Sequence, residues 1–303
     1  MEGGIYTVLV TPFTEKNEID LDSYDILLEK IYKSNIEGVV VLGTTSESPT
    51  LNYNEKIILV KTVWNKFKGK KKVVVGIGGN NTMETLEFAK EVKEYCNYMM
   101  VTVPHYNKPS QKGIKSHFLK ICLEEELNKK KFILYNIPSR CGVNMLPDTI
   151  AEVYNQCDNV VAIKDASGSL NQVIDIKNKC DIQIFSGDDS LILPILSIGG
   201  SGVISVIGNI FPDELHEIFS LYKLENVKSS QIKFYKLYDL MKALFIETNP
   251  VPTKALLKYM NIFECDNPRL PLVKMSDVNY LELINIYKII NSMNECQSEI
   301  EFF

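Results

Sequence analysis

One lysine, Lys164, follows a short apolar run, and this arrangement is typical of covalent catalysis by an amine. The apolar residues 160–163 precede Lys164, and the turn-forming segment 165–168 follows it. Four apolar residues before a turn predict a buried strand. Burial disfavours the charged form of an amine, and a neutral lysine can attack a carbonyl group to form a Schiff base. A single lysine at a strand end more often only extends into solvent, so the prediction depends on the residues around it.

The elements that must position Lys164 alternate between short apolar runs and amphipathic segments of helical length. Segments 23–34, 54–66 and 82–94 have helical spacing, and the hydroxyls of Thr82 and Thr85 can cap the third. Eight alternations within ~220 residues predict an α/β fold, a (β/α)8 TIM barrel. An open doubly wound sheet usually carries Gly-x-Gly-x-x-Gly after its first strand, which is missing here. The runs predicted as strands are 5–10, 39–42, 73–77, 99–103, 132–135, 160–163, 182–185 and 203–206.

After residue 212, no further apolar run has the pattern of a strand. Apolar residues between 237 and 244 fall at helical spacing. Asn249-Pro250 has the pattern of a helix cap followed by a proline in the first turn. We therefore predict a barrel catalytic domain of residues 1–225 and a C-terminal helical domain of residues 226–303.

Composition and charge restrict the classes of function. The 303 residues are 45% hydrophobic and 23% charged, as in an ordinary globular protein. A net charge of −5 without a long basic run argues against binding to nucleic acid or to an anionic membrane surface. The seven cysteines are odd in number and include no Cys-x-x-Cys pair, which favours a reducing compartment. No signal peptide or membrane span is recognisable, so we expect a cytoplasmic protein.

Polar side chains follow several of the predicted strands, at the barrel rim where reactive residues gather. Tyr135 ends the fifth run, and its phenol could carry a proton while an amine attacks a carbonyl group. Thr44 and Thr45 offer backbone N–H groups and hydroxyls to a small carboxylate, and Arg140 offers a guanidinium to a second one. Each residue also has an ordinary alternative: a core tyrosine, a helix cap and a solvated arginine.

Metal-binding patterns are weak in this sequence. Asp188 and Asp189 are adjacent, but no third ligand accompanies them. The three histidines, His105, His117 and His216, are scattered and match neither a zinc motif nor a histidine-based catalytic triad. We therefore predict that the protein uses no metal and no cofactor.

Eight short motifs follow one another along nearly the whole chain. They are Gly43-Thr44-Thr45-x-Glu47, Pro104-x-Tyr106-Asn107-x-Pro109-Ser110-Gln111, Tyr135-Asn136-Ile137-Pro138-Ser139-Arg140, Ile163-Lys164, Ser186-Gly187-Asp188, Gly202-Val203-Ile204-Ser205-Val206, Glu247-Thr248-Asn249-Pro250 and Arg269-Leu270-Pro271. This ordered set resembles the dihydrodipicolinate synthase family, which belongs to the pyruvate-dependent class I aldolases. Several motifs in order are far more specific than any one of them.

The resemblance implies a catalytic role for four residues. Lys164 would form a Schiff base with pyruvate, and Tyr135, Thr45 and Tyr106 would relay protons. In the family the tyrosine at the position of Tyr106 enters the active site of the neighbouring subunit. The resemblance therefore implies a homodimer as the smallest catalytic unit, or a homotetramer built from two such dimers.

The same resemblance implies how two substrates would be bound. Thr44 and Thr45 would hold the pyruvate carboxylate, with Gly187 and the main chain of Ile204 close to the amine. Arg140 would bind the carboxylate of aspartate semialdehyde. The enamine would then attack the aldehyde, and cyclisation would give the heterocycle of diaminopimelate and lysine biosynthesis.

Five positions depart from the usual family pattern. Ser46 replaces a common glycine, which matters if that turn requires a positive φ. His105, Cys141 and Asp165 stand where tyrosine, threonine and glutamate are usual. Lys56 replaces the histidine or acid of members that are inhibited by lysine. Its ammonium group would repel a cationic ligand, so we expect weak or absent inhibition by lysine.

Two other functions are compatible with parts of this pattern. A sister aldolase, such as N-acetylneuraminate lyase or a 2-keto-3-deoxy sugar acid aldolase, would share Lys164 and Tyr135. Arg140 and the two threonines favour the synthase, because a carboxylated aldehyde requires a cationic partner that a polyol does not. A catalytically silent barrel with a regulatory role is the second alternative, and the intact set of reactive residues argues against it.

Overall fold

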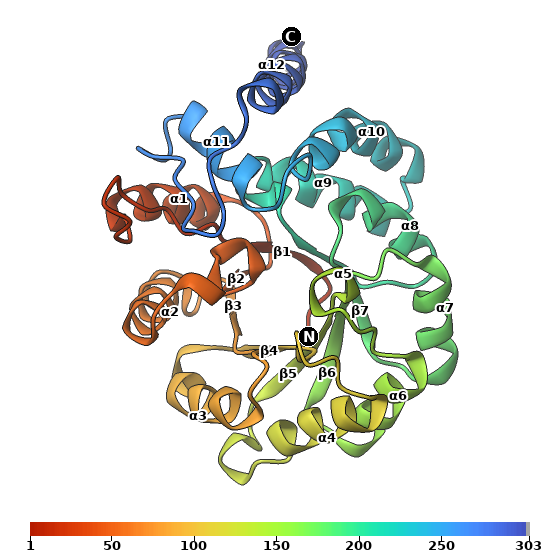
Figure 1. Ribbon diagram of the computed structural model, residues 1–303. Coiled ribbons are helices and arrows are strands. Elements are labelled where there is room, and N and C mark those ends of the chain that lie inside the picture. Colours follow the sequence, from red (N-terminus) through yellow and green to blue (C-terminus); the bar gives the residue numbers. More distant parts are fainter. Residues whose placement is uncertain (301–303) are drawn as a thin grey trace.

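Eight parallel strands close into a barrel in the computed structural model of the chain (Figure 1). The structure describes residues 1–300, with side chains described through residue 292. Each strand pairs in parallel with the next, and the last pairs with the first, which confirms the predicted (β/α)8 TIM barrel. The strands are β1 (Gly4–Val8), β2 (Gly38–Val41), β3 (Lys72–Gly76), β4 (Tyr98–Thr102), β5 (Lys131–Asn136), β6 (Val160–Asp165), β7 (Gln183–Ser186) and β8 (Gly202–Ser205).

Helices outside the barrel connect the strands. The α-helices are α1 (Leu21–Lys33), α2 (Tyr53–Phe67), α3 (Thr82–Val92), α4 (Gln111–Cys122), α5 (Pro138–Cys141), α6 (Pro147–Gln156), α7 (Leu170–Lys179), α8 (Ile192–Ser197) and α9 (Pro212–Lys223). The 3-10 helices are η1 (Thr44–Ser46), η2 (Ser48–Thr50), η3 (Lys93–Tyr95), η4 (Glu125–Leu127), η5 (Asp189–Leu191) and η6 (Ile207–Asn209). The loops that follow the carboxyl ends of the strands form the rim of the barrel.

Capping side chains determine where several helices begin. The Asp20 carboxylate accepts a hydrogen bond from the Ser23 backbone N–H, so α1 begins two residues before the predicted start. Asn81 caps α3 through its side chain, whereas Thr82 is already the first helical residue. The hydroxyl of Thr85 donates to the Asn81 carbonyl instead of capping the helix. The prediction that the two threonines cap α3 was therefore wrong.

Two apolar layers form the core, because successive strand residues point to opposite sides of the sheet. Tyr6, Val40, Val74, Ile133 and Phe185 are among the residues that fill the barrel interior. The rings of Tyr6 and Phe185 meet edge to face, with centroids 5.6 Å apart. The other faces of the strands pack against the surrounding helices. The barrel interior is therefore a packed core, and in barrels of this kind the reactive residues lie at the rim.

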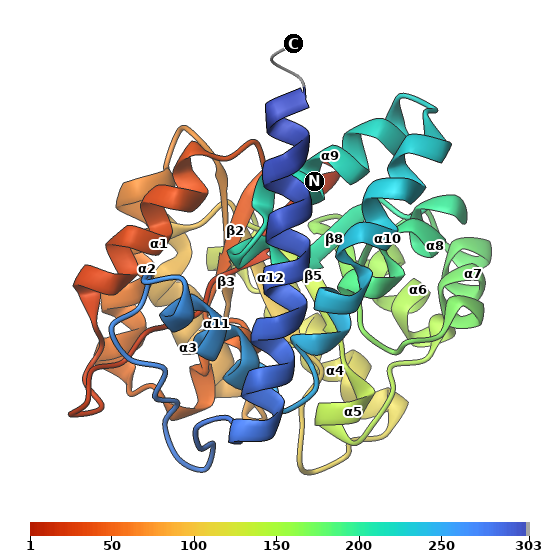
Figure 2. The ribbon, with the colours of Figure 1, turned by 90° about the horizontal axis from the view of Figure 1, so that it is seen from above.

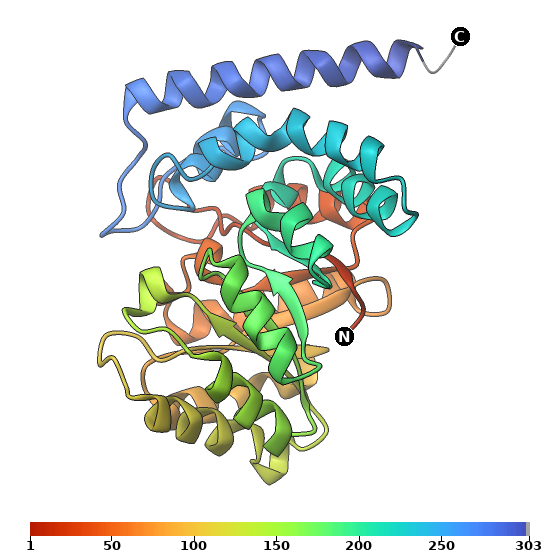
Figure 3. The same cartoon turned by 90° about the vertical axis from the view of Figure 1, so that its right-hand side faces the viewer.

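Three further helices follow the barrel: α10 (Val227–Ala243), α11 (Val251–Tyr259) and α12 (Asp277–Ile300). The long helix α12 lies across α10 and α11 (Figures 2 and 3). It also reaches the barrel, since the ring of Tyr287 stacks on that of Phe211 with centroids 5.9 Å apart. The helical character predicted for this segment is confirmed. Its division from the barrel at residue 226 as a separate domain stays a prediction.

None of the helices in the described part of the chain is long and apolar enough to cross a membrane. The cysteines whose side chains are described, six in number, are all unpaired. Cys296 lies outside the residues with described side chains.

Candidate active site

Lys164 is the second-to-last residue of β6, near the carboxyl end of the strand. It shares its side of the strand with Ala162, which belongs to the barrel interior. Only 5% of Lys164 is exposed. Burial lowers the pKa of Lys164 from its ordinary value of 10.5 to about 7, and Asp189 acts in the opposite direction while Arg140 lowers it further. A large fraction of the amine is therefore neutral, and nucleophilic, near pH 7.

Tyr135 lies directly beside Lys164 on the neighbouring strand. The two residues are partners in the register of β5 and β6, and the lysine Nζ is 4.5 Å from the tyrosine ring centroid. Burial raises the pKa of Tyr135 to about 12, although a hydrogen bond with Thr44 and the charge of Arg140 act in the opposite direction. The phenol thus keeps its proton at neutral pH and is available as a proton donor beside the amine.

Thr44 and Thr45 both lie in η1, the turn that follows β2. The Thr45 Oγ1 atom is buried and accepts a hydrogen bond of 2.9 Å from the Asn249 Nδ2 atom. Thr44 contacts Tyr135, so the ends of β2 and β5 meet at one place. Thr44, one of the two predicted carboxylate-binding residues, therefore lies next to the predicted proton donor.

Ser46 supports η1 without requiring a special backbone conformation. Its hydroxyl donates to the Leu9 carbonyl over 2.7 Å, and its own carbonyl accepts from Thr11 Oγ1 over 3.0 Å. In this loop the positive φ angles belong to Leu42 and Glu47, and Ser46 has none. The serine is therefore compatible with the turn and adds a hydrogen bond that glycine could not make.

Glu47 joins the loop of η1 and η2 to the C-terminal segment through a buried ion pair. The fully buried Lys254 donates to its carboxylate, and the Arg269 backbone N–H donates to Glu47 Oε2 over 2.9 Å. Lys254 also donates to the Asn267 carbonyl over 2.9 Å. The cations of Lys254 and Arg269 lie over the Phe13 ring, 4.1 and 4.3 Å from its centroid. Removing one charge of such a pair would leave the other buried and unpaired, which is strongly destabilising.

Arg140 lies in α5, which follows β5, and its side chain is exposed at the rim. Its Nη2 atom donates to the Asn249 carbonyl over 3.1 Å. A guanidinium has five N–H donors, so others are available to a carboxylate. The adjacent Cys141 is buried and its thiol donates to the Val103 carbonyl.

Asn249 was predicted to cap α11, and that prediction was wrong. Pro250 occupies the cap position, without a side-chain hydrogen bond. The side chain of Asn249 instead contacts Thr45, and its carbonyl contacts Arg140. Its place within the motif 247–250 was the only signal in the sequence, because a local pattern does not reveal a partner more than 200 residues away.

Gly187 and Ile204 lie at the ends of β7 and β8, on the same rim. The Gly187 N–H donates to the Asp165 carbonyl over 2.7 Å. A Cβ atom at this position would lie 2.6 Å from the Ala166 Cβ atom, so only glycine fits. Ile204 is buried in the barrel interior, beside Tyr6 of β1 in the strand register.

The carboxylates of Asp165 and Asp189 accept hydrogen bonds that connect neighbouring segments of the rim. Asp165 accepts from Asn136 and Gln172, at 3.0 and 2.8 Å, so the residue that replaces the usual glutamate is fully engaged. Asp189 is buried, which raises its pKa, and it accepts from the backbone N–H groups of Val206 and Ile207 at 2.9 Å each. Within the described residues, no group of three or more His, Cys, Asp or Glu side chains could hold a metal ion.

Tyr106 is exposed, unlike the three other predicted catalytic residues, which are buried. It belongs to the loop between β4 and α4, is 83% exposed and has a φ of 68°. His105 beside it is exposed as well. Within one chain, Lys164, Tyr135 and Thr45 are therefore buried, whereas the Tyr106 side chain is exposed to solvent.

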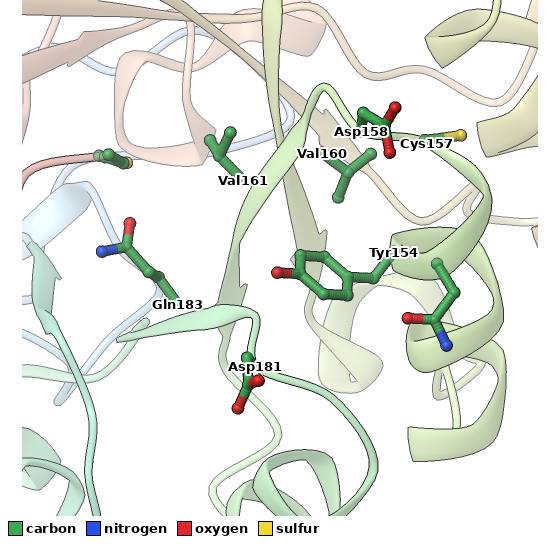
Figure 4. Close-up of a pocket in the computed structure, with 9 residues that line it drawn as sticks. Tyr154, Cys157, Asp158, Val160, Val161, Asp181 and Gln183 are labelled. Atoms are coloured by element: carbon green, nitrogen blue, oxygen red, sulfur yellow. The ribbon is translucent and has the colours of Figure 1, made fainter.

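Two cavities of the protein lie away from Lys164. One, of about 480 Å³, is at the opposite end of the barrel, where β6 and β7 begin, and its lining includes Tyr154, Asp158 and Gln183 (Figure 4). The other, of about 350 Å³, is a surface hollow between α1 and the segment after α11. Reactive residues of barrel enzymes lie at the carboxyl ends of the strands, so neither cavity competes with the rim as the active site.

A buried, partly neutral lysine beside a phenol on a barrel rim defines the class: a lyase of the class I aldolase type. The family model for the dihydrodipicolinate synthetase family matches residues 1–290. A 4-hydroxy-tetrahydrodipicolinate synthase of Endomicrobium trichonymphae is 41% identical over 285 residues, which cover 93% of this chain and 96% of that protein. The chain therefore belongs to the dihydrodipicolinate synthetase family, as its motifs predicted.

Solved structures of similar proteins agree with this assignment. The dihydrodipicolinate synthase of Thermotoga maritima superposes with a TM-score of 0.92 at 37% identity, covering 96% of this chain and 99% of that one. A structure described as a monomeric dihydrodipicolinate synthase variant has the same TM-score and identity, with coverage of 96% and 97%. The fold predicted from the alternation of strands and helices is thus that of the family.

Proposed function

We propose that Lys164 carries out the condensation of pyruvate with L-aspartate 4-semialdehyde, which gives 4-hydroxy-tetrahydrodipicolinate. Relatives that match nearly the whole chain are named for this activity. The reaction belongs to diaminopimelate and lysine biosynthesis. The observation that carries the proposal is the buried Lys164 amine, with a pKa of about 7, placed 4.5 Å from the ring of Tyr135.

The first half-reaction follows from the protonation states of these two residues. The neutral amine of Lys164 attacks the pyruvate carbonyl carbon, and the protonated phenol of Tyr135 supplies a proton as water leaves. Thr44 and Thr45 hold the pyruvate carboxylate, with Gly187 and the main chain of Ile204 alongside. Loss of a methyl proton from the imine then gives the enamine, a carbon nucleophile.

The second half-reaction requires a site for the aldehyde. The enamine carbon attacks the aldehyde carbon of the semialdehyde, and the semialdehyde amine then attacks the imine carbon. Cyclisation releases the Lys164 amine for the next cycle. Arg140 is exposed at the rim and retains free N–H donors, so it can bind the semialdehyde carboxylate in a bidentate manner. A sugar-acid aldehyde carries hydroxyl groups there and gains less from a guanidinium.

We propose that the active site is completed by Tyr106 of a second subunit, in a homodimer or homotetramer. The exposure of the Tyr106 side chain supports this proposal, because a second subunit could cover it. Tyr53 and Met83, at the starts of α2 and α3, are also exposed apolar side chains, which suit an interface. We also propose a cytoplasmic location, because the six described cysteines are unpaired.

An assay of substrate preference tests the proposed reaction. The enzyme is incubated with pyruvate and either aspartate semialdehyde or sugar-acid aldehydes, and consumption of pyruvate is followed. Faster turnover of aspartate semialdehyde is expected. Turnover of the sugar-acid aldehydes alone would assign the protein to a sister aldolase, and loss of Arg140 would then have little effect.

A further inference from the structure

Asn249 contacts two residues of the candidate site, Thr45 and Arg140, although it belongs to the segment between α10 and α11. Its Nδ2 atom donates to Thr45 Oγ1 over 2.9 Å, and its carbonyl accepts from Arg140 Nη2 over 3.1 Å. The residue is only 6% exposed. One residue therefore touches the proposed proton relay with its side chain and the proposed carboxylate-binding arginine with its main chain.

The direction of the hydrogen bond with Thr45 has a chemical consequence. A threonine hydroxyl has one proton to donate and can accept hydrogen bonds as well. Because Thr45 Oγ1 accepts from Asn249, its own proton is left for a different acceptor in the site. The Asn249 Oδ1 atom is buried without a hydrogen-bond partner, so in this arrangement the amide does not take up the Thr45 proton.

The position of Asn249 is fixed by contacts on both sides of it in the sequence. The Val251 N–H donates to the Thr248 carbonyl over 2.9 Å, and the Lys254 N–H donates to the Pro250 carbonyl over 3.0 Å. Lys254 in turn pairs with Glu47, which directly follows η1. The same segment thus holds the Thr45 loop at two points.

We propose that Asn249 is a positioning residue that orients the Thr45 hydroxyl for proton relay, so that the C-terminal segment forms part of the active site. The proposal rests on the proposed function, because it assigns Thr45 to the relay. Asn249 acts on Thr45 through its side chain and on Arg140 through its main chain. The two actions can therefore be separated by substitution.

Exchange of the pyruvate methyl protons in D2O, followed by NMR, tests this proposal without the aldehyde. Exchange requires the imine and the relay, whereas condensation also requires Arg140 and the second substrate. Asn249→Ala removes the amide donor. The nearly isosteric Asn249→Asp replaces the amide with a carboxylate, which accepts the Thr45 proton instead of donating to Thr45. We expect both variants to slow exchange about 10- to 100-fold, which is below the roughly 100- to 10,000-fold contribution of a general acid–base group because Asn249 only orients Thr45.

The values of kcat and KM distinguish a positioning role of Asn249 from a general loss of structural stability in the variants. Asn249→Ala keeps the main-chain carbonyl, so kcat should fall while KM for aspartate semialdehyde changes less than about threefold. Asn279→Ala is the matched control, because the Asn279 amide in α12 donates to Glu247, which has no proposed role in the reaction, over 2.8 Å. Its exchange rate should equal that of the unmodified enzyme.

Exchange within twofold of the unmodified enzyme in both Asn249 variants would overturn the proposal. So would a rise in KM for both substrates together with a lowered Tm in both variants, since that result indicates a structural role alone. If the unmodified enzyme exchanges pyruvate protons but does not consume aspartate semialdehyde, the proposed function fails while the effect on exchange still decides the role of Asn249.

Discussion

Lys164 and Tyr135 are register partners on neighbouring strands, and the amine of one lies 4.5 Å from the ring centroid of the other. Burial acts on the two groups in opposite directions, since it lowers the pKa of the lysine to about 7 and raises that of the tyrosine to about 12. Near pH 7 the phenol is therefore neutral, and a large fraction of the amine is neutral as well. A neutral amine is the nucleophile and a neutral phenol is the acid that imine formation requires.

The rate of imine formation should depend on pH with a midpoint near 7. Lys164 loses its proton as the pH rises through its pKa of about 7, so the nucleophilic fraction increases and then levels off. Rapid mixing of enzyme with pyruvate between pH 5.5 and 9 measures this rate. A rate that still rises about tenfold per pH unit up to pH 9, as expected for an amine with the ordinary lysine pKa of 10.5, would show that burial does not control the amine.

Arg140→Ala should impair the use of aspartate semialdehyde far more than it impairs the imine with pyruvate. Each lost hydrogen bond to a charged group typically costs roughly 1.5–3 kcal/mol. We therefore expect kcat/KM for the aldehyde to fall at least tenfold, while borohydride trapping of pyruvate stays near its original extent. Equal loss of both steps would assign Arg140 a structural role.

Much of this fold and site could be predicted because the signals are local. Apolar runs locate all eight strands, and a parallel barrel brings their ends to one rim, which places Lys164 near Tyr135. The end of β6 was missed, because Asp165 is a polar strand residue held by Asn136 and Gln172. A hydrophobic pattern cannot predict that a carboxylate lies within a strand when the hydrogen bonds that stabilise it come from distant residues.

The long-range polar contacts could not be predicted. Lys254 has the spacing of an ordinary helix lysine, but its partner Glu47 lies 207 residues earlier in the chain. Asn249-Pro250 has the local pattern of a helix cap, and the contact with Thr45 depends on how the C-terminal segment docks. Such contacts follow from the assembled fold, so a single sequence does not reveal them.

Hybrid dimers should recover activity if Tyr106 acts across an interface. Tyr106→Phe and Lys164→Ala subunits should each be nearly inactive when assembled with themselves. After exchange, a mixed dimer contains one site with both residues intact, so roughly a quarter of the original activity is expected from random pairing. Native mass spectrometry provides the control for exchange. Mixed dimers without any recovered activity would show that each site is built from one chain.

Inhibition by lysine should be weak, because Lys56 would face a cationic ligand. Lys56 is half-buried, and burial lowers its pKa while Glu84 acts in the opposite direction. At an effective dielectric constant of about 20, two cations about 4–6 Å apart repel each other by ~3–4 kcal/mol before screening. Dose–response curves for the unmodified enzyme and for Lys56→His test this. Strong inhibition of the unmodified enzyme below millimolar lysine would contradict the prediction.

Borohydride trapping tests the central claim, that Lys164 forms an imine with pyruvate, most directly. Reduction in the presence of pyruvate should leave a stable adduct on the peptide that contains Lys164, as identified by mass spectrometry. Lys164→Arg should give no adduct and almost no activity, because a guanidinium remains protonated and is a poor nucleophile. An active enzyme whose Lys164 remains unmodified after reduction, or an adduct on another lysine, would contradict the account.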